Sequence, residues 1–430
     1  MDSPYQRELA LAFAALQGAA RLSQSIVSSA DKGAISKSDL SPVTIADFAV
    51  QSLLIATCKA AFPDDTFVGE EDASDLRANP ALLERVWHLL QGVKTFQEEA
   101  QFAVPETKDQ LCNLVDQAGS GKPGGGRTWV FDPIDGTKTF IRGELYAINV
   151  ALLVDGKQDV SAVACPNMSM NATAPLNNPD VDPSGEGCIV YAVKGHGAWV
   201  RSLSGNAGNV QHRQLPHVSS VTAPEDGLRF ITSVAMADSA LDGVHEAVAQ
   251  RLNAAYPGCD LLPWVLRWAA LAMGLGNTTV WVYKRRDRYA KAWDHAGAML
   301  LFEETGGKIT DVHGKDIDLA AGRKMSANFG FVAAPESLHP RVLAAVQDVL
   351  REAGHEELLR PITFWTTQTL TLGFVFGVNP CRYVEHGVLS FAARDCQKLR
   401  VSTGPELRVQ LSTFEYQLRV GRYEQDRPNR

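Results

Sequence analysis

Two aspartates three positions apart follow an apolar stretch in WVFDPIDGTKTF, residues 129–140. Asp132 and Asp135 are predicted where a buried strand meets a turn, which is a costly place for charge unless a cation lies nearby. Pro133 keeps Asp132 out of the helical region and removes one backbone donor, so a helix cannot begin before Asp135. Such a loop can direct both carboxylates and the Ile134 carbonyl into one space, and this mixture of oxygen ligands suits a hard cation such as Mg²⁺.

The residues after this pair favour a seat for phosphate. Gly136 relieves the turn, and Thr137 then begins a predicted helix whose free N–H groups can bind an anion. The alternative is ordinary turn and capping chemistry, because Asp followed by Gly is common in turns and an Asp before a helix is often only a cap. Local spacing alone leaves these two interpretations open.

Three further acids stand where ligands or bases would be expected, although each has a plain structural alternative. Glu70 follows a predicted strand over residues 66–68, and a solvated acidic turn would look the same. Asp47 and Asp294 are predicted at the starts of helices, where a carboxylate also stabilises the helix dipole. Each signal is weak alone, but their joint occurrence with the 132–135 pair favours a shared site.

The rest of the chain predicts the elements that must position these acids. Asp155-Gly156 between two apolar runs indicates a hairpin. The stretch AWDHAGAMLLFEETGG, residues 292–307, predicts one continuous helix that ends at two glycines. Strands mixed with helices indicate an α/β or α+β fold of packed layers. Apolar spacing predicts further helices at residues 4–29, from about Pro42 to Pro63, at 74–118 with loops, and at 239–254, 262–275 and 338–353.

Composition limits the class of protein. The chain has 430 residues, of which 45% are hydrophobic and 21% charged, and this is ordinary for a globular protein. A net charge of −8 argues against a nucleic-acid polymer as partner, and no apolar run is long enough to cross a membrane. Seven scattered cysteines without a CxxC pattern predict reduced thiols in the cytoplasm.

Four ordered motifs carry a family resemblance: VTIAD, GEED, DPIDGT and WDHAGAMLLFEETGG. They resemble the signatures of the inositol-monophosphatase superfamily over about residues 5–350, and the flanking sequence is most similar to its 3′(2′),5′-bisphosphate nucleotidases. The resemblance implies a Mg²⁺-dependent, lithium-sensitive phosphomonoesterase with an αβαβα layered sandwich. We expect an N-terminal α+β part over 1–165, a C-terminal α/β part over 166–353, and an atypical extension, disordered or poorly packed, over 354–430.

The resemblance also implies roles for individual residues. Asp47 and Thr137 resemble the pair that orients and deprotonates the attacking water, with no covalent intermediate. Asp135, Gly136 and Thr137 would also present groups to the phosphate. The residues that would hold two or three Mg²⁺ ions are Glu70, Asp132, Ile134 through its carbonyl, Asp135 and Asp294.

The stretch that would select the substrate departs from the family pattern. Nucleotidases of this family carry a Ser-x-x-Lys pair on a helix here, and Trp264 and Arg267 stand at those positions. Arg267 could bind a second phosphate and Trp264 could stack on adenine. The alternative is that they fill the core, because Trp264 and Trp268 are four apart on one helical face.

The preferred expectation is hydrolysis of the 3′-phosphate of 3′-phosphoadenosine 5′-phosphate, a by-product of sulfate assimilation. The nearest alternative keeps the chemistry and changes the substrate to an inositol phosphate or another small phosphomonoester. A second alternative is a non-catalytic homologue that binds a nucleotide. The expected partner is a small phosphate ester, with no membrane involved, and the oligomeric state is left open.

Overall fold

The computed structural model describes most of the chain. These residues are 3–27, 35–36, 42–43, 45–94, 101–204, 210–217, 227–233, 239–360, 400–402, 408–411 and 414–417. They fall into two units, Met1–Ile362 and Thr363–Arg430. The first unit contains every residue that the sequence assigns to a site.

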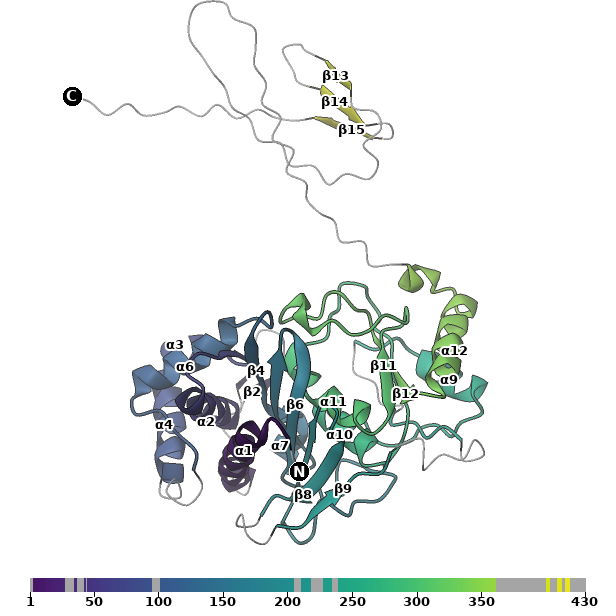
Figure 1. The fold of residues 1–430 in the computed structure, drawn as a ribbon. Coiled ribbons are helices and arrows are strands. Elements are labelled where there is room, and N and C mark those ends of the chain that lie inside the picture. Colours follow the sequence, from purple (N-terminus) through teal and green to yellow (C-terminus); the bar gives the residue numbers. More distant parts are fainter. Residues whose placement is uncertain are drawn as a thin grey trace, which may run out of the picture. The chain divides into compact units, whose positions relative to one another are not determined.

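The first unit has five layers that alternate between helices and sheets (Figure 1). A helical layer covers one face of a seven-stranded sheet, and two helices, α10 (Trp264–Ala272) and α11 (Ala298–Glu303), cover the other face. Beyond them lies a three-stranded sheet, with α9 (Val244–Arg251) and α12 (His339–Glu352) on its far side. The predicted αβαβα sandwich is therefore confirmed. The outer helical layer consists of α1 (Gln6–Val27), α2 (Ile45–Ala61), α3 (Ser74–Ala78), α4 (Pro80–Lys94) and α6 (Lys108–Ser120).

Each strand of the large sheet lies beside its neighbour in sequence, in the order β3-β4-β5-β6-β7-β8-β9. The β3–β4 pair is parallel, and the other pairs are antiparallel. The predicted hairpin at Asp155-Gly156 joins β5 to β6, and both residues have the positive φ that a tight hairpin turn requires, 50° and 75°. The strands are β3 (Thr66–Gly69), β4 (Arg127–Asp135), β5 (Ala147–Val154), β6 (Lys157–Cys165), β7 (Cys188–Val193), β8 (Ala198–Ser202) and β9 (His212–Gln214).

The small sheet of the first unit is antiparallel, in the order β10-β12-β11. Its strands are β10 (Thr279–Trp281), β11 (Gly307–Thr310) and β12 (Phe331–Pro335). The described part of the unit also contains short pieces: β1 (Ile35–Ser36), β2 (Pro42–Val43), α7 (Thr137–Arg142), and the 3₁₀ turns η1 (Ala292–Asp294), η2 (Leu319–Ala321) and η3 (Glu356–Leu359). Among the described residues, no helix is both long and apolar enough to cross a membrane.

The single helix predicted over 292–307 is wrong. A 3₁₀ turn, η1, carries Asp294, and α11 begins only at Ala298. Between them Gly297 has φ 78°, and a Cβ at this position would lie 2.3 Å from the Cβ of Ala151 on β5. The helix breaks because the chain approaches β5 too closely at this point for any side chain.

The predicted domain boundary at 165/166 stays a prediction, as does a disordered extension over 354–430. The described chain crosses the first boundary inside one sheet, because β6 pairs with β7. Most of the extension lies outside the described residues. The second unit contains an antiparallel sheet of three strands: β13 (Arg400–Ser402), β14 (Arg408–Leu411) and β15 (Phe414–Gln417).

Candidate active site

Asp132 and Asp135 lie on either side of a bulge at the end of β4. Asp132 is opposite Asn149 of β5 and Asp135 is opposite Ala147, so β4 carries one more residue than β5 between these pairs. Pro133 occupies this irregular stretch, where a residue without an N–H group interrupts no regular ladder. Asp132 is only 1% exposed. The strand thus delivers two carboxylates to a buried edge, as the sequence predicts.

The carboxylate of Asp135 binds the N-terminus of α10. Its Oδ1 accepts the N–H of Trp264 at 3.1 Å and its Oδ2 accepts the N–H of Leu266 at 3.0 Å. Pro263 precedes the helix and offers no side-chain cap, so Asp135 supplies the missing acceptor from another element. Burial raises the pKa of Asp135 to about 7, the α10 N–H groups oppose this rise, and the charge of Glu70 adds to it.

Gly136 forms the turn between β4 and α7. Its φ of 88° and ψ of 47° are left-handed, and a Cβ here would lie 2.4 Å from Cγ of Pro263. Only glycine lets this turn approach the start of α10 so closely. Thr137 begins α7, and its hydroxyl donates to the Ile134 carbonyl at 3.4 Å. The predicted order of strand, turn and helix is confirmed.

Asp47 and Glu70 reach the same region from α2 and from the end of β3. Asp47 is buried in the first turn of α2, and Glu70 directly follows β3 and is half-buried. Gln51, one turn after Asp47, donates to the Glu71 carbonyl at 2.8 Å and accepts the Glu71 N–H at 2.9 Å. One amide therefore ties α2 to the segment that carries Glu70.

Asn149 binds the backbone of the turn that carries Asp294, the last residue of η1. The Nδ2 group of Asn149 donates to the Trp293 carbonyl at 2.9 Å and to the Ala296 carbonyl at 2.8 Å. Asn149 is also the register partner of Asp132. A single buried side chain on β5 thus fixes the Asp294 turn beside the strand that carries Asp132.

The five acids influence one another electrostatically. Burial raises the pKa of Asp132 well above its usual range, and the charges of Glu70, Asp135, Asp294 and Asp47 raise it further. Burial likewise raises the pKa of Asp294, followed by the charges of Glu70 and Asp135. Because the interaction between charges weakens with distance, acids from four separate parts of the chain share one neighbourhood.

The donor set fits a hard cation. Oδ1 of Asp132 is buried and has no hydrogen-bond partner among the described atoms, although a buried carboxylate oxygen ordinarily has one. Across the described ranges, no three His, Cys, Asp or Glu side chains already converge on a point as a finished metal cage. Without a cation, carboxylates of like charge repel one another or take up protons, so the ligand set stays a prediction.

Trp264 and Arg267 lie in an aromatic cluster beside the acids. Arg267 is 2% exposed, and its guanidinium carbon lies 4.1 Å from the ring centroid of Trp264 and 5.0 Å from that of Trp281. The Trp264 and Trp268 rings stack at 5.9 Å, which supports the interpretation that they pack the core. Nη2 of Arg267 donates to the Leu262 carbonyl at 3.0 Å, whereas its Nε and Nη1 have no partner among the described atoms.

Three side chains that position the acids were not singled out from the sequence: Gln51, Asn149 and Arg323. Each binds backbone atoms of a segment that carries an acid. For the two amides a signal was available, because each interrupts an apolar run, DFAVQSLL and YAINVALLV. A buried amide must be hydrogen-bonded, so its presence predicts a structural contact. Arg323 lies in a polar stretch without any such signal.

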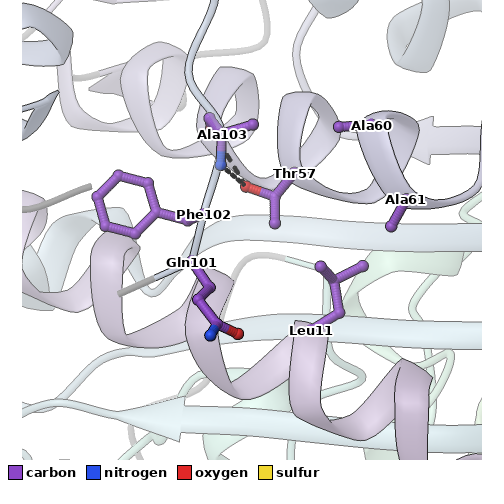
Figure 2. A pocket seen from close by; sticks show the side chains of 7 residues that line it. All are labelled: Leu11, Thr57, Ala60, Ala61, Gln101, Phe102 and Ala103. Atoms are coloured by element: carbon purple, nitrogen blue, oxygen red, sulfur yellow. Dashed lines mark hydrogen bonds between the residues drawn. The ribbon is translucent and has the colours of Figure 1, made fainter. Parts of the chain in front are cut away.

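A separate pocket of about 640 Å³ lies between α1, α2 and residues 101–103 (Figure 2). The hydroxyl of Thr57 accepts the Ala103 N–H at 2.9 Å there. None of the described residues that line this pocket is charged, which makes it a poor site for a phosphate ester. Its lining residues are Leu11, Thr57, Ala60, Ala61, Gln101, Phe102 and Ala103.

Comparison with known proteins assigns the family. Residues 5–351 match the model of the inositol monophosphatase family. This chain belongs to the inositol monophosphatase family. Among its relatives, a protein of Emericella nidulans named 3′(2′),5′-bisphosphate nucleotidase is 34% identical over 358 residues, which cover 81% of this chain and 99% of the relative. A protein of Schizosaccharomyces pombe with the same name is 34% identical over 82% of this chain and 98% of its own.

A solved family structure shares the fold. The staphylococcal inositol monophosphatase-1, in a complex soaked with LiCl, superposes with a TM-score of 0.50. The alignment covers 80% of this chain and 96% of that protein, at 17% sequence identity. At this identity the likeness concerns the fold alone, and it agrees with the layered sandwich of the inositol monophosphatase family described above.

Proposed function

We propose that this member of the inositol monophosphatase family is a Mg²⁺-dependent phosphomonoesterase. Its preferred reaction is removal of the 3′-phosphate from 3′-phosphoadenosine 5′-phosphate, which gives AMP and phosphate. The group of buried and half-buried acids around Asp132 carries the proposal for the chemistry. The name shared by the two fungal relatives supports the choice of a nucleotide bisphosphate as substrate.

Two or three Mg²⁺ ions would be held by oxygen atoms from five residues of this site. Bound Mg²⁺ would neutralise the phosphate dianion and lower the pKa of water. Asp135 keeps lone pairs for this role, because each of its oxygens accepts one α10 N–H and a carboxylate oxygen can accept more than one bond. The proposed ligands are Glu70, Asp132, the Ile134 carbonyl, Asp135 and Asp294.

Asp47 and Thr137 would prepare the attacking water. Asp47, a buried carboxylate in the first turn of α2, would accept the proton of that water. The hydroxyl of Thr137 donates to the Ile134 carbonyl, so its oxygen remains an acceptor that can orient the water. The turn formed by Asp135, Gly136 and Thr137 would contact the phosphate.

Trp264 and Arg267 lie at the start of α10, and we propose that they select the substrate. Nε and Nη1 of Arg267 are buried donors without a described partner, and a second phosphate of the nucleotide would satisfy them. Because Arg267 is enclosed by Trp264 and Trp281, this contact requires a neighbouring ring to move. The same enclosure favours the second candidate, a phosphatase for inositol monophosphate or another small ester.

Phosphate release, with Mg²⁺ present and with EDTA, tests the proposal. We expect Mg²⁺-dependent release from adenosine 3′,5′-bisphosphate with a kcat/KM at least about ten-fold above that for inositol monophosphate, a margin of about 1.4 kcal/mol. D132N should abolish release. The reverse preference would establish the second candidate. Absence of release from every small ester would indicate a non-catalytic nucleotide-binding protein.

The substitution R267M tests the substrate-selecting role separately. We expect KM for the bisphosphate to rise about ten-fold or more, with KM for inositol monophosphate unchanged, because only the nucleotide carries the second phosphate. Equal effects on both substrates would assign Arg267 to the core.

We also propose the cytoplasm as the compartment, because the five described cysteines, Cys58, Cys112, Cys165, Cys188 and Cys259, are free thiols.

A further inference from the structure

The side chain of Arg323 is bound to the segment that carries Glu70. Its Nη2 donates to the Gly69 carbonyl at 2.7 Å and to the Glu70 carbonyl at 3.3 Å. These carbonyls belong to the end of β3, where the chain leaves the sheet. More than 250 positions separate them from Arg323 along the sequence, so the contact joins distant parts of the chain.

The main chain of Arg323 is bound to the turn that carries Asp294. The Arg323 carbonyl accepts the N–H of Ala292, the first residue of η1, at 2.9 Å. The guanidinium carbon lies 4.7 Å from the ring centroid of Trp293, in the geometry of a cation–π contact. Arg323 therefore contacts the residue directly before Asp294 while it holds the backbone of Glu70.

A third contact anchors this arrangement. Nη1 of Arg323 donates to the Ala118 carbonyl in the last turn of α6 at 2.8 Å. The last carbonyls of a helix lack partners within the helix, so a guanidinium here satisfies a group that would otherwise need another donor. The planar fork of arginine can donate in two directions while its face stacks on a ring, whereas lysine cannot.

We propose that Arg323 is a positioning residue that sets the spacing between Glu70 and Asp294, and thereby the metal affinity of the site. The inference rests on the proposed function, because it takes both acids as metal ligands. Arg323 itself is not among the proposed metal ligands or substrate-binding residues. Removal of groups that orient metal ligands typically weakens metal binding or activity about 10- to 100-fold, and that is the effect expected here.

The test compares R323M and R323K with the control R286M. Arg286 makes contacts of the same kind, with its guanidinium carbon 5.0 Å from the Phe329 centroid and a hydrogen bond to the Leu358 carbonyl at 2.9 Å, but neither partner belongs to a segment that carries a proposed metal ligand. Mg²⁺ binding is measured by titration calorimetry and by the rise in Tm that Mg²⁺ produces. We expect about 10- to 100-fold weaker binding for R323M, a partial loss for R323K, and wild-type binding for R286M.

Kinetics supply the second readout. At saturating Mg²⁺, R323M should recover most of kcat with little change in KM for the ester, because the substrate contacts remain. Wild-type Mg²⁺ affinity in a folded R323M, or equal losses in R323M and R286M, would overturn the inference while leaving the proposed function intact. Wild-type protein that binds Mg²⁺ but hydrolyses no ester would overturn the function only. Wild-type protein that does not bind Mg²⁺ would overturn both.

Discussion

The carboxylate of Asp135 accepts the backbone N–H of Leu266 at 3.0 Å, across 131 positions of sequence. The same carboxylate accepts the N–H of Trp264 at 3.1 Å, so it caps α10 from the end of β4. Because Asp135 also belongs to the group of acids around Asp132, one residue both caps α10 and contributes to the proposed metal site.

Replacement of Asp135 should lower the stability of the protein by an amount that depends on the new residue, whereas activity should be lost with either replacement. D135A leaves two N–H groups at the start of α10 without their acceptor, and we expect a loss of about 2–3 kcal/mol in the free energy of unfolding. D135N keeps one acceptor oxygen and should lose roughly half as much. Both variants should lose Mg²⁺-dependent hydrolysis. Urea denaturation in EDTA measures the stability term, and equal stability of the two variants would contradict the capping role.

Gly136 and Gly126 form a matched pair for testing the turn after β4. Both have positive φ, 88° and 75°, but a Cβ at 136 would lie 2.4 Å from Pro263, whereas a Cβ at 126 would meet nothing within 4 Å. G126A should cost about 1 kcal/mol, the penalty of a left-handed alanine. G136A should cost about 1–3 kcal/mol more, because the overlap must displace Pro263. Thermal or urea unfolding of both variants measures the difference, and equal costs would contradict the close approach.

Features that depend on neighbouring residues could be predicted from the sequence. The turn at Asp155-Gly156 and the break after Asp135 follow from the conformations that Gly and Pro allow, whatever surrounds them. The candidate acids could also be identified, because their residue types and order are distinctive. The roles assigned to them stay predictions, and the phosphatase experiment above addresses them.

Features that depend on distant contacts could not be predicted. The stretch 292–307 has helical spacing throughout, and it breaks only because Gly297 must approach Ala151 on β5. Likewise, nothing near Arg323 in sequence indicates that it reaches the Glu70 carbonyl. In both cases the deciding partner lies more than 100 positions away, and a local pattern carries no information about it.

Asn149 should be as important for stability as for the placement of Asp294. Its side chain donates two hydrogen bonds inside the protein, to the carbonyls of Trp293 and Ala296. N149L should cost about 2–4 kcal/mol, because both carbonyls stay buried without a donor. Denaturation with and without Mg²⁺ measures this cost. The control is S161A. Ser161 is another buried polar residue of the same sheet, and its hydroxyl has no described partner. S161A should therefore lower the free energy of unfolding by less than about 1 kcal/mol. Similar losses in the two variants would contradict the role of Asn149.

His245 should make stability depend on pH. The ring is 1% exposed, and its Nε2 accepts the Val282 N–H at 3.0 Å, so this nitrogen must be unprotonated in the folded protein. Burial, followed by the charge of Arg267, lowers the pKa of His245 from 6.5 to about 3. Between these values the unfolded chain binds the proton and the folded chain does not. The stabilisation is therefore complete above pH 6.5 and is lost as the pH falls toward 3.

The variant H245Q isolates this contribution, because glutamine can still accept the Val282 N–H but does not titrate. One pH unit below 6.5, the wild type should have lost about 1.4 kcal/mol relative to its value at pH 8, beyond any loss seen in H245Q. Urea denaturation at half-unit steps from pH 8 to pH 5 measures the two curves. If the H245Q curve ran parallel to that of the wild type, a buried neutral His245 would be ruled out.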